Sequence, residues 1–171
     1  MDLLKDTVLA DRQIFVEEVV GELLTRKGLT ICTAESCTGG LIGHLLTQVA
    51  GSSAYFKGSL VAYHNQIKIS ELNVLEELIV SCGAVSKEVV CAMAINAKKK
   101  FFTDFSVATS GIAGPGGGTD EKPVGLVHLA VAHKTGVEHK KCLFGDKNRS
   151  DIKTASALTA LKMLQDKVSS L

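Results

Sequence analysis

The sequence has no excess of either charge and no long apolar run, and each absence excludes a class of protein. Lysine and arginine number 19 against 18 aspartates and glutamates, so the formal net charge is +1. A protein that follows a phosphate backbone needs clustered positive charge, so no nucleic-acid partner is expected. No apolar run reaches the roughly 18 residues of a membrane-spanning helix. Because polar residues also interrupt the N-terminal stretch, we expect no membrane contact, no export and a cytoplasmic location.

Cysteine pairs are also missing. The five cysteines, at positions 32, 37, 82, 91 and 142, are odd in number and form no Cys-x-x-Cys pair. Their spacing predicts neither a metal site of the zinc type nor a disulfide framework, and a reducing compartment fits it best. With 171 residues and 46% hydrophobic composition, the chain is long enough for one domain over residues 1–171 with a substantial core.

Proline is scarce, and both prolines of the chain lie in one glycine-rich loop. The run from Thr109 to Gly125 contains six glycines and these two prolines, between two strand-like apolar segments. Glycine lets a backbone approach a ligand closely, and proline reduces the entropy that a loop loses on ordering. A ligand site is therefore predicted here. The alternative is a wide surface hairpin between two strands.

The loop does not fit either of two familiar phosphate-binding motifs. A Walker A loop needs a lysine followed by serine or threonine and then a helix, whereas Lys122 precedes Pro123 and a strand. A dinucleotide-binding Gly-x-Gly-x-x-Gly pattern that starts at Gly114 has Thr119 in its last position, and no helix follows. The loop glycines alone therefore do not identify a ligand.

Hydrophobic periodicity predicts alternating helices and strands. Helices are expected over residues 9–27, 41–49, 66–72, 86–101 and 150–168. Strands are expected over residues 29–33, 58–63, 105–109, 124–132 and 138–144. The early alternation and a late hairpin centred on Gly136 predict a mixed sheet with helices on both faces. The expected fold is a three-layer α/β/α sandwich.

Two potential nucleophiles lie where the first strand meets the next helix. The segment Thr33–Gly40 reads TAESCTGG, and ligands gather at this end of an open α/β sheet, where helix N–H groups attract anions. Ser36 needs a base to become nucleophilic, whereas a helix N-terminus activates a cysteine such as Cys37 by lowering its pKa. The alternative is that the serine only caps the helix and that Glu35 is a solvated charge.

A candidate base follows another strand, in the polar cluster from Tyr63 to Lys68. A partly desolvated lysine loses its proton near neutral pH and deprotonates a serine, so Lys68 is a candidate base and His64 its rival. A solvated surface lysine is the simpler interpretation of the position alone. His128 and His133 have no ligand-like partners by spacing and are interpreted as structural or surface histidines.

A third polar cluster, residues 145–149, precedes the last predicted helix. Arg149 is one of three arginines in the chain, and its guanidinium is suited to clamp a phosphate or a carboxylate. Without a ligand, this cluster is an ordinary loop at the start of a helix.

Together these segments resemble the CinA C-terminal domain family. Its members carry strings like TAESCTGG, GSSAYF, GAVS and SGIAGPGGGT-x-EKPVG, with a strand that ends in tyrosine and with asparagine before a lysine. The likeness follows the same order along the chain and covers residues 9–164. It implies the stand-alone form without the N-terminal CinA module, similar to nicotinamide mononucleotide deamidase.

The resemblance implies a reaction of pyridine nucleotide salvage. The carboxamide of nicotinamide mononucleotide is hydrolysed to nicotinic acid mononucleotide and ammonia, with no cofactor and no metal. Ser36 matches the nucleophile of the family, Lys68 the base that activates it, and Tyr63 a polar partner that orients them or aids proton transfer. Backbone N–H groups near Cys37 and Thr38, or of residues 110–112, are alternative donors to the oxyanion.

The resemblance also suggests where the substrate binds. N–H groups of the glycine loop are expected to bind its 5′-phosphate, and Arg149 or Lys122 to add charge. The expected substrate-binding residues are Cys37, Thr38, Gly39, Asn65, Ser110, Gly111, Gly114, Gly117, Gly118, Lys122 and Arg149. The chain departs from the family at His64 and Gln66, where serine and glutamate are common, and at Lys153, where a second arginine is common.

Two other functions compete with a nucleotide amidase. One is a non-catalytic nucleotide-binding or interaction domain of the competence/damage-inducible CinA type, which would bind a ligand without releasing ammonia. The other is a hydrolase of a different amide or a phosphoester, which would differ only in the shape of its pocket. The apolar helices and the resemblance both predict a homodimer.

Overall fold

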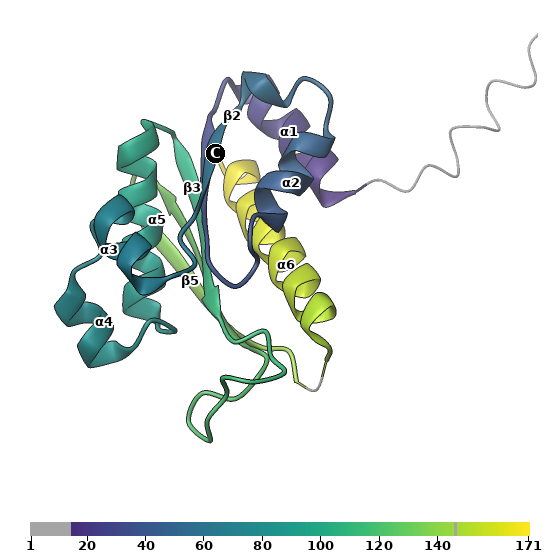
Figure 1. The fold of residues 1–171 in the computed structure, drawn as a ribbon. Coiled ribbons are helices and arrows are strands. Elements are labelled where there is room, and N and C mark those ends of the chain that lie inside the picture. The colour runs from purple at the N-terminus through teal and green to yellow at the C-terminus, as the bar shows by residue number, and fades with distance from the viewer. Residues whose placement is uncertain (1–14, 146) are drawn as a thin grey trace, which may run out of the picture.

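A five-stranded mixed sheet forms the middle layer of the protein (Figure 1). The computed structural model describes residues 15–145 and 147–171. The strands are β1 (Ile31–Glu35), β2 (Phe56–Val61), β3 (Phe105–Gly111), β4 (Leu126–His133) and β5 (Gly136–Leu143), in the spatial order β2-β1-β3-β4-β5. β1 runs parallel to β2 and β3, whereas β4 is antiparallel to both β3 and β5.

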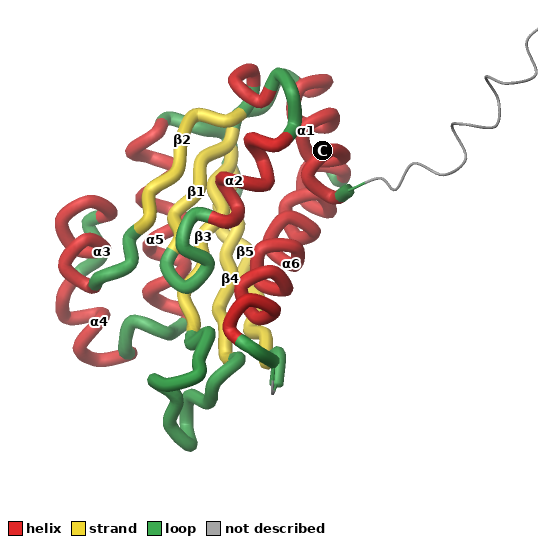
Figure 2. The backbone as a smooth tube through the Cα atoms, turned by 45° about the vertical axis from the view of Figure 1, so that its right-hand side comes forward, coloured by secondary structure: helices red, strands yellow, loops and turns green. Residues whose placement is uncertain are grey.

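The helices form two outer layers (Figure 2). On one face lie α1 (Val16–Lys27), α2 (Leu41–Gln48) and α6 (Arg149–Ser169), and on the other α5 (Lys87–Phe101) covers the sheet with α3 (Asn65–Leu72) and α4 (Glu76–Cys82) beside it. Each face of the sheet has its own cluster of buried apolar side chains. This arrangement confirms the expected three-layer α/β/α sandwich with a mixed sheet.

Burial along the strands follows from this layering. All residues of β1 are buried, and in β3 only Gly111 is partly exposed, because helices cover both faces of the central strands. Along the edge strand β2, partly buried and exposed residues alternate, which is the pattern of a strand with one covered face. In the described part of the chain, no helix combines the length and the apolar character needed to cross a bilayer.

Local sequence signals set several helix ends. α1 ends at Gly28, which adopts the left-handed conformation with φ 64° that helix C-caps favour. α5 begins after Ser86, whose hydroxyl accepts the N–H of Val89 at 3.3 Å. Both ends lie where the sequence predicts them.

The predicted elements agree with the structure except at some boundaries and at one helix. β1 begins and ends two residues later than predicted, and the part of the first predicted helix over residues 9–14 lies outside the described residues. α4 was not predicted. It has seven residues, none of them buried, and exposes Val80 at 80%, so it has no apolar stripe that a sequence pattern could reveal.

The topology brings three strand ends together. From β1 the chain passes through α2 to β2 on one side, and then through α3, α4 and α5 to β3 on the other side of β1. Ligands of open α/β sheets bind outside the carboxyl ends of the strands at such a reversal. The loop over residues 112–125 leaves β3 at this edge, at the bottom of Figure 1.

Candidate functional site

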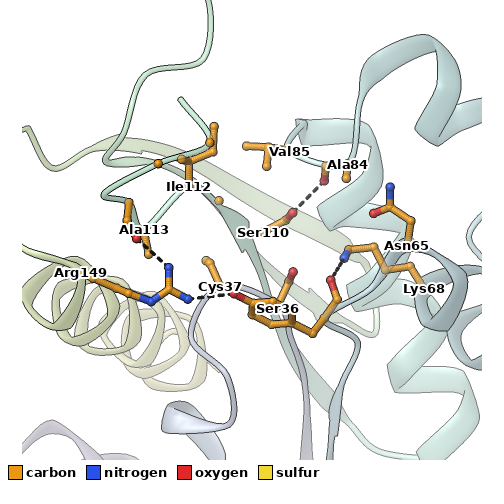
Figure 3. Close-up of a pocket in the computed structure, with 15 residues that line it drawn as sticks. Ser36, Cys37, Asn65, Lys68, Ala84, Val85, Ser110, Ile112, Ala113 and Arg149 are labelled. Atoms are coloured by element: carbon orange, nitrogen blue, oxygen red, sulfur yellow. Dashed lines mark hydrogen bonds between the residues drawn. The ribbon is translucent and has the colours of Figure 1, made fainter. Parts of the chain in front are cut away.

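A pocket of about 270 Å³ lies at the carboxyl ends of the parallel strands (Figure 3). It brings together ten of the predicted site residues: Ser36, Cys37, Tyr63, Asn65, Lys68, Ser110, Gly111, Gly114, Gly117 and Arg149. Its other lining residues are Ala84, Val85, Ile112, Ala113 and Gly116, of which the sequence had singled out only Ile112, as an alternative donor to the oxyanion. Figure 3 shows Ser36 between Arg149 on the left and Lys68 on the right.

Ser36 is held by its backbone, and its side chain is unpartnered. It directly follows β1, and its N–H donates to the Thr109 carbonyl of β3 at 3.1 Å. The residue is 8% exposed, and its hydroxyl has no hydrogen-bond partner within residues 15–145 and 147–171. A buried hydroxyl normally has a partner, so this one is available to a ligand in the pocket.

The carboxylate of Glu35 fills the N-terminus of α2. It is fully buried and accepts the N–H groups of Gly40 at 3.0 Å, Ile42 at 3.1 Å and Gly43 at 2.8 Å. The alternatives that Glu35 is solvated and that Ser36 caps this helix are therefore both wrong. The expected attraction of a substrate anion to this helix is also wrong, because the protein's own carboxylate occupies the position.

Cys37 is a poor nucleophile in this environment. Burial raises the pKa of its thiol to about 11, and its hydrogen bond to Thr109 offsets only part of this effect. The expected lowering of the Cys37 pKa at a helix N-terminus is therefore wrong. The physical reason is that desolvation of a thiolate outweighs the helix dipole when another group already caps the helix. Of the two potential nucleophiles, the pocket favours Ser36.

Lys68 is a buried amine near the start of α3. It is 1% exposed, and its Nζ donates to the carbonyls of Ala62 at 2.9 Å and Tyr63 at 3.0 Å. Burial lowers the pKa of Lys68, and no carboxylate among the described residues forms an ion pair with it. In its neutral form the amine would have two N–H donors and one lone pair. Because two donors already bond to carbonyls, that lone pair would be left to accept a proton.

Arg149 lines the pocket from the first turn of α6. Its Nη1 donates to the Gly114 carbonyl at 2.7 Å, and its Nη2 donates to the Tyr63 hydroxyl at 2.8 Å. Both acceptors are neutral, and no ion pair neutralises this guanidinium within the described residues. Tyr63 is 57% exposed. An uncompensated arginine at an accessible pocket is suited to bind an anionic group of a ligand.

The glycine loop is fastened to the segment between α4 and α5. The Nζ of Lys122 donates to the carbonyls of Cys82 at 2.7 Å and Val85 at 2.9 Å, and the Ser110 hydroxyl donates to the Ala84 carbonyl at 2.7 Å. Gly83 has φ 78°, and a Cβ there would lie 2.6 Å from the Lys122 Nζ. Lys122 therefore anchors the glycine loop to the residues that follow α4, and it does not line the pocket itself.

Three other predicted substrate-binding residues also lie outside the pocket lining. The Thr38 hydroxyl is fully buried and contacts Glu35 at 2.7 Å and Thr109 at 2.8 Å. Gly39 lies near the Lys153 ammonium, and a Cβ on Gly118 would come within 2.8 Å of the Val124 nitrogen. The Thr38 hydroxyl is therefore engaged by the protein itself, and the positions of Gly39 and Gly118 give no support to contact with a substrate.

The histidines lie away from the pocket. His64, the rival base, caps α3 by accepting the Gln66 N–H at its Nδ1. His128 is buried, and its Nδ1 lies 2.9 Å from the Nε2 of His139, with the two rings stacked. Within residues 15–145 and 147–171, no three His, Cys, Asp or Glu side chains are grouped so that they could hold a metal ion.

The stacked pair of buried His128 and half-buried His139 predicts a loss of stability at mildly acidic pH. Burial, then His139 and Lys141, lower the pKa of His128 to about 4 from 6.5. The unfolded chain therefore takes up this proton first, so stability falls as the pH drops from about 6.5 to about 4, by at most about 3 kcal/mol for this group. We expect the urea midpoint of wild type to fall between pH 7 and pH 5, and by less in His128→Gln.

His44 provides the control for this prediction. It is an exposed histidine of α2 whose ring contacts Gln48. The variant His44→Gln should keep the wild-type pH dependence. Equal losses of stability in wild type and His128→Gln would show that another group is responsible.

Comparisons with known proteins support the interpretation of the fold. The model of the CinA C-terminal domain family matches residues 13–168. The chain is 49% identical over 152 residues to a CinA-like protein of Crocosphaera subtropica, with 88% of this chain and 37% of the relative covered. A CinA-like protein of Dictyoglomus thermophilum is 47% identical over 163 residues, covering 95% of this chain and 39% of the relative. The chain thus spans a little over a third of the length of these curated relatives.

Solved structures resemble the chain over nearly all of its length. The competence/damage inducible protein CihA from Agrobacterium tumefaciens is 43% identical, with a TM-score of 0.86 and with 92% of this chain and 99% of that chain covered. A CinA superfamily protein from Klebsiella pneumoniae is 28% identical, with a TM-score of 0.87 and with 91% and 97% covered.

Proposed function

Because the chain belongs to the CinA C-terminal domain family and its pocket pairs a buried serine with a buried lysine, we propose that it is an amidohydrolase. Its substrate is nicotinamide mononucleotide, and its products are nicotinic acid mononucleotide and ammonia. The competence/damage-inducible names of similar proteins describe no chemistry, so the proposal rests on the pocket and on the family resemblance.

One observation carries the proposal. The unpartnered Ser36 hydroxyl and the Lys68 amine with its lowered pKa line the same pocket. A serine hydroxyl becomes a nucleophile when a neighbouring neutral amine removes its proton, and burial is the usual way to obtain a neutral lysine amine. A domain that only binds nucleotides has no need for an uncompensated buried amine beside a free hydroxyl.

The reaction proceeds in two halves. The Ser36 oxygen adds to the amide carbon while its proton passes to the Lys68 Nζ, and the electron pair of the carbonyl moves to its oxygen. When the carbonyl re-forms, the C–N bond breaks and the leaving nitrogen takes the proton from Lys68, giving ammonia and an acyl-serine. Water then adds to the acyl carbon while its proton passes to Lys68. When the carbonyl re-forms, the bond to the Ser36 oxygen breaks and this oxygen takes the proton from Lys68, which releases the free acid.

The other end of the substrate carries a phosphate, and Arg149 is its proposed partner. Its guanidinium meets only neutral oxygens and lies on the side of Ser36 opposite Lys68 (Figure 3). In the glycine loop, Ala113, Gly114, Gly116 and Gly117 line the pocket, and their backbone N–H groups have no acceptor among the described residues. Free loop N–H groups and a guanidinium together provide the donors that a phosphate requires.

The direct test is ammonia release from nicotinamide mononucleotide by the purified chain, with the nucleotide product identified by chromatography. We expect stoichiometric ammonia and nicotinic acid mononucleotide. A folded protein that binds the nucleotide with no ammonia release would instead be a binding domain. Turnover of other amides but not of nicotinamide mononucleotide would support an amidohydrolase and contradict the proposed substrate.

Replacing Arg149 by methionine tests the proposed phosphate contact. A charge-assisted contact of about 2 kcal/mol corresponds to a rise in KM of roughly 30-fold for the phosphorylated substrate. Nicotinamide riboside has no phosphate, so its KM should be nearly the same for wild type and Arg149→Met. An equal rise for both substrates would mean that Arg149 acts through Tyr63 or Gly114 and does not bind the phosphate.

A further inference from the structure

The turn after β1 leaves two backbone donors unused. Of the eight N–H groups from Ser36 to Gly43, six have an oxygen acceptor: those of Ser36, Gly39, Leu41, Gly40, Ile42 and Gly43. The N–H groups of Cys37 and Thr38 have no oxygen acceptor within residues 15–145 and 147–171. The Cys37 N–H interacts with its own sulfur, which is a weak acceptor.

These two donors are buried beside a reactive group. Cys37 is 5% exposed and lines the pocket, and Thr38 is fully buried. A buried N–H group without an acceptor is rare and costly, so it indicates a position that a ligand atom fills. The residue before them, Ser36, presents an unpartnered hydroxyl to the same pocket. The turn therefore contains a nucleophile and two unused donors in succession.

One of the competing donors is already in another contact. The N–H of Ile112, a candidate from the sequence, donates to the Leu126 carbonyl at 2.9 Å. Ser110 and Gly111 lie opposite His128 and Val127 in the antiparallel pairing of β3 with β4, where only alternate N–H groups face the partner strand. The sequence left residues 37–38 and 110–112 as equal alternatives. The bond of Ile112 removes one donor of the second set, and the experiment below separates its remaining donors from residues 37–38.

We propose that the backbone N–H groups of Cys37 and Thr38 form the oxyanion hole of this site, and that Glu35 is the positioning residue that holds them. The inference rests on the proposed function. When the Ser36 oxygen adds to the amide carbon, the carbonyl π bond breaks and its electron pair becomes the oxyanion, which accepts these two N–H groups. The hydrogen bonds strengthen as charge develops, so they lower the barrier more than they stabilise the bound amide.

Glu35 acts without touching the substrate. One carboxylate oxygen accepts the Thr38 hydroxyl at 2.7 Å and the Gly40 N–H at 3.0 Å, so it fixes the turn on both sides of Gly39. The Thr38 hydroxyl also contacts Thr109, whose carbonyl holds the Ser36 N–H. The buried Glu35 carboxylate therefore fixes the positions of the Ser36 nucleophile and of both N–H donors.

The test uses a tetrahedral adduct on the intact chain. Pyridine-3-boronic acid becomes a tetrahedral anion when a serine oxygen adds to it, and it needs no turnover. With 15N-labelled protein, we expect the Cys37 and Thr38 amide protons to shift downfield on adduct formation, because they gain an anionic acceptor. The Gly39 amide, which already donates to the Ser36 carbonyl, should shift less. Ser36→Ala should give no adduct.

The outcomes distinguish this inference from the proposed function. An adduct at Ser36 with shifts at Ser110 and Gly111 in place of Cys37 and Thr38 would overturn the oxyanion hole and leave the nucleophile intact. No adduct at Ser36 would overturn the proposed nucleophile and this inference together.

Glu35→Gln tests the positioning role. Its amide NH₂ would face donors that now meet a carboxylate oxygen, so we expect kcat to fall on the order of 10²-fold while the Kd of nicotinic acid mononucleotide is unchanged. Turnover of the thiocarboxamide analogue should fall less, because sulfur accepts hydrogen bonds weakly. An equal fall for both substrates would indicate a structural role only. Thr33→Val, which removes another hydrogen bond to Glu35, is the matched control. If Glu35→Gln does not fold, the amide shifts of the labelled wild-type protein still test the proposed oxyanion hole.

Discussion

Ser36→Ala is expected to reduce kcat for nicotinamide mononucleotide on the order of 10⁴-fold or more, because it removes the atom that forms the acyl intermediate in the proposed mechanism. The fold should remain. The Ser36 hydroxyl has no partner among the described residues, so its removal breaks no hydrogen bond there, and the change in unfolding free energy should stay within about 1 kcal/mol. Binding of the intact nucleotide, measured by calorimetry, should persist in this variant.

Ser156→Ala is the matched control for this substitution. Ser156 is a fully buried serine of α6 that does not line the pocket. It should keep wild-type kcat within a few-fold. Full activity in Ser36→Ala together with lost activity in Cys37→Ala would transfer the nucleophilic role to the thiol, against the raised pKa of Cys37.

Lys68→Met should reduce kcat on the order of 10³-fold or more, because methionine keeps the length of the side chain but has no proton acceptor of comparable basicity. Lys122→Met is the control that separates the loss of a base from the loss of hydrogen bonds that anchor the backbone. Lys122 also donates to two carbonyls but lies outside the pocket lining, so its loss should cost at most about tenfold in kcat. Comparable losses in both variants would mean that Lys68 is an anchor and not a base.

The pH profile of the wild-type protein tests the same proposed role. In the proposed mechanism the active form of Lys68 is the neutral amine, so kcat/KM should rise with pH and level off above the pKa of Lys68. Because burial lowers that pKa from its ordinary 10.5, the plateau should begin below pH 10.5. A profile governed by a histidine-like group would point to a different base.

The layout of the site was predictable because polar residues after strands converge at one edge of a parallel sheet. Ser36 follows β1, and Tyr63 and Lys68 follow β2, so the predicted strand ends were enough to bring them to one pocket. The order of motifs along the chain also indicated the family. Neither inference needed side-chain detail.

Two features of the site could not be predicted, because they depend on contacts between distant segments. The burial of Glu35 and Cys37 follows from how the turn folds back on α2 and β3, and no local pattern reveals which polar side chain does so. The role of Lys122 depends on α4, which the sequence pattern missed, because its acceptors are the carbonyls of Cys82 and Val85 at and beyond the end of that helix.

The polar side chains that shape this pocket donate most of their hydrogen bonds to main-chain carbonyl oxygens. Lys68, Ser110, Lys122 and Arg149 all donate to backbone carbonyls, at Ala62, Tyr63, Ala84, Cys82, Val85 and Gly114. A carbonyl is present whatever side chain its residue carries. A substitution that the packing at one of these positions accommodates therefore keeps the anchoring oxygen, whereas the loss of any of the four donor side chains removes an anchor.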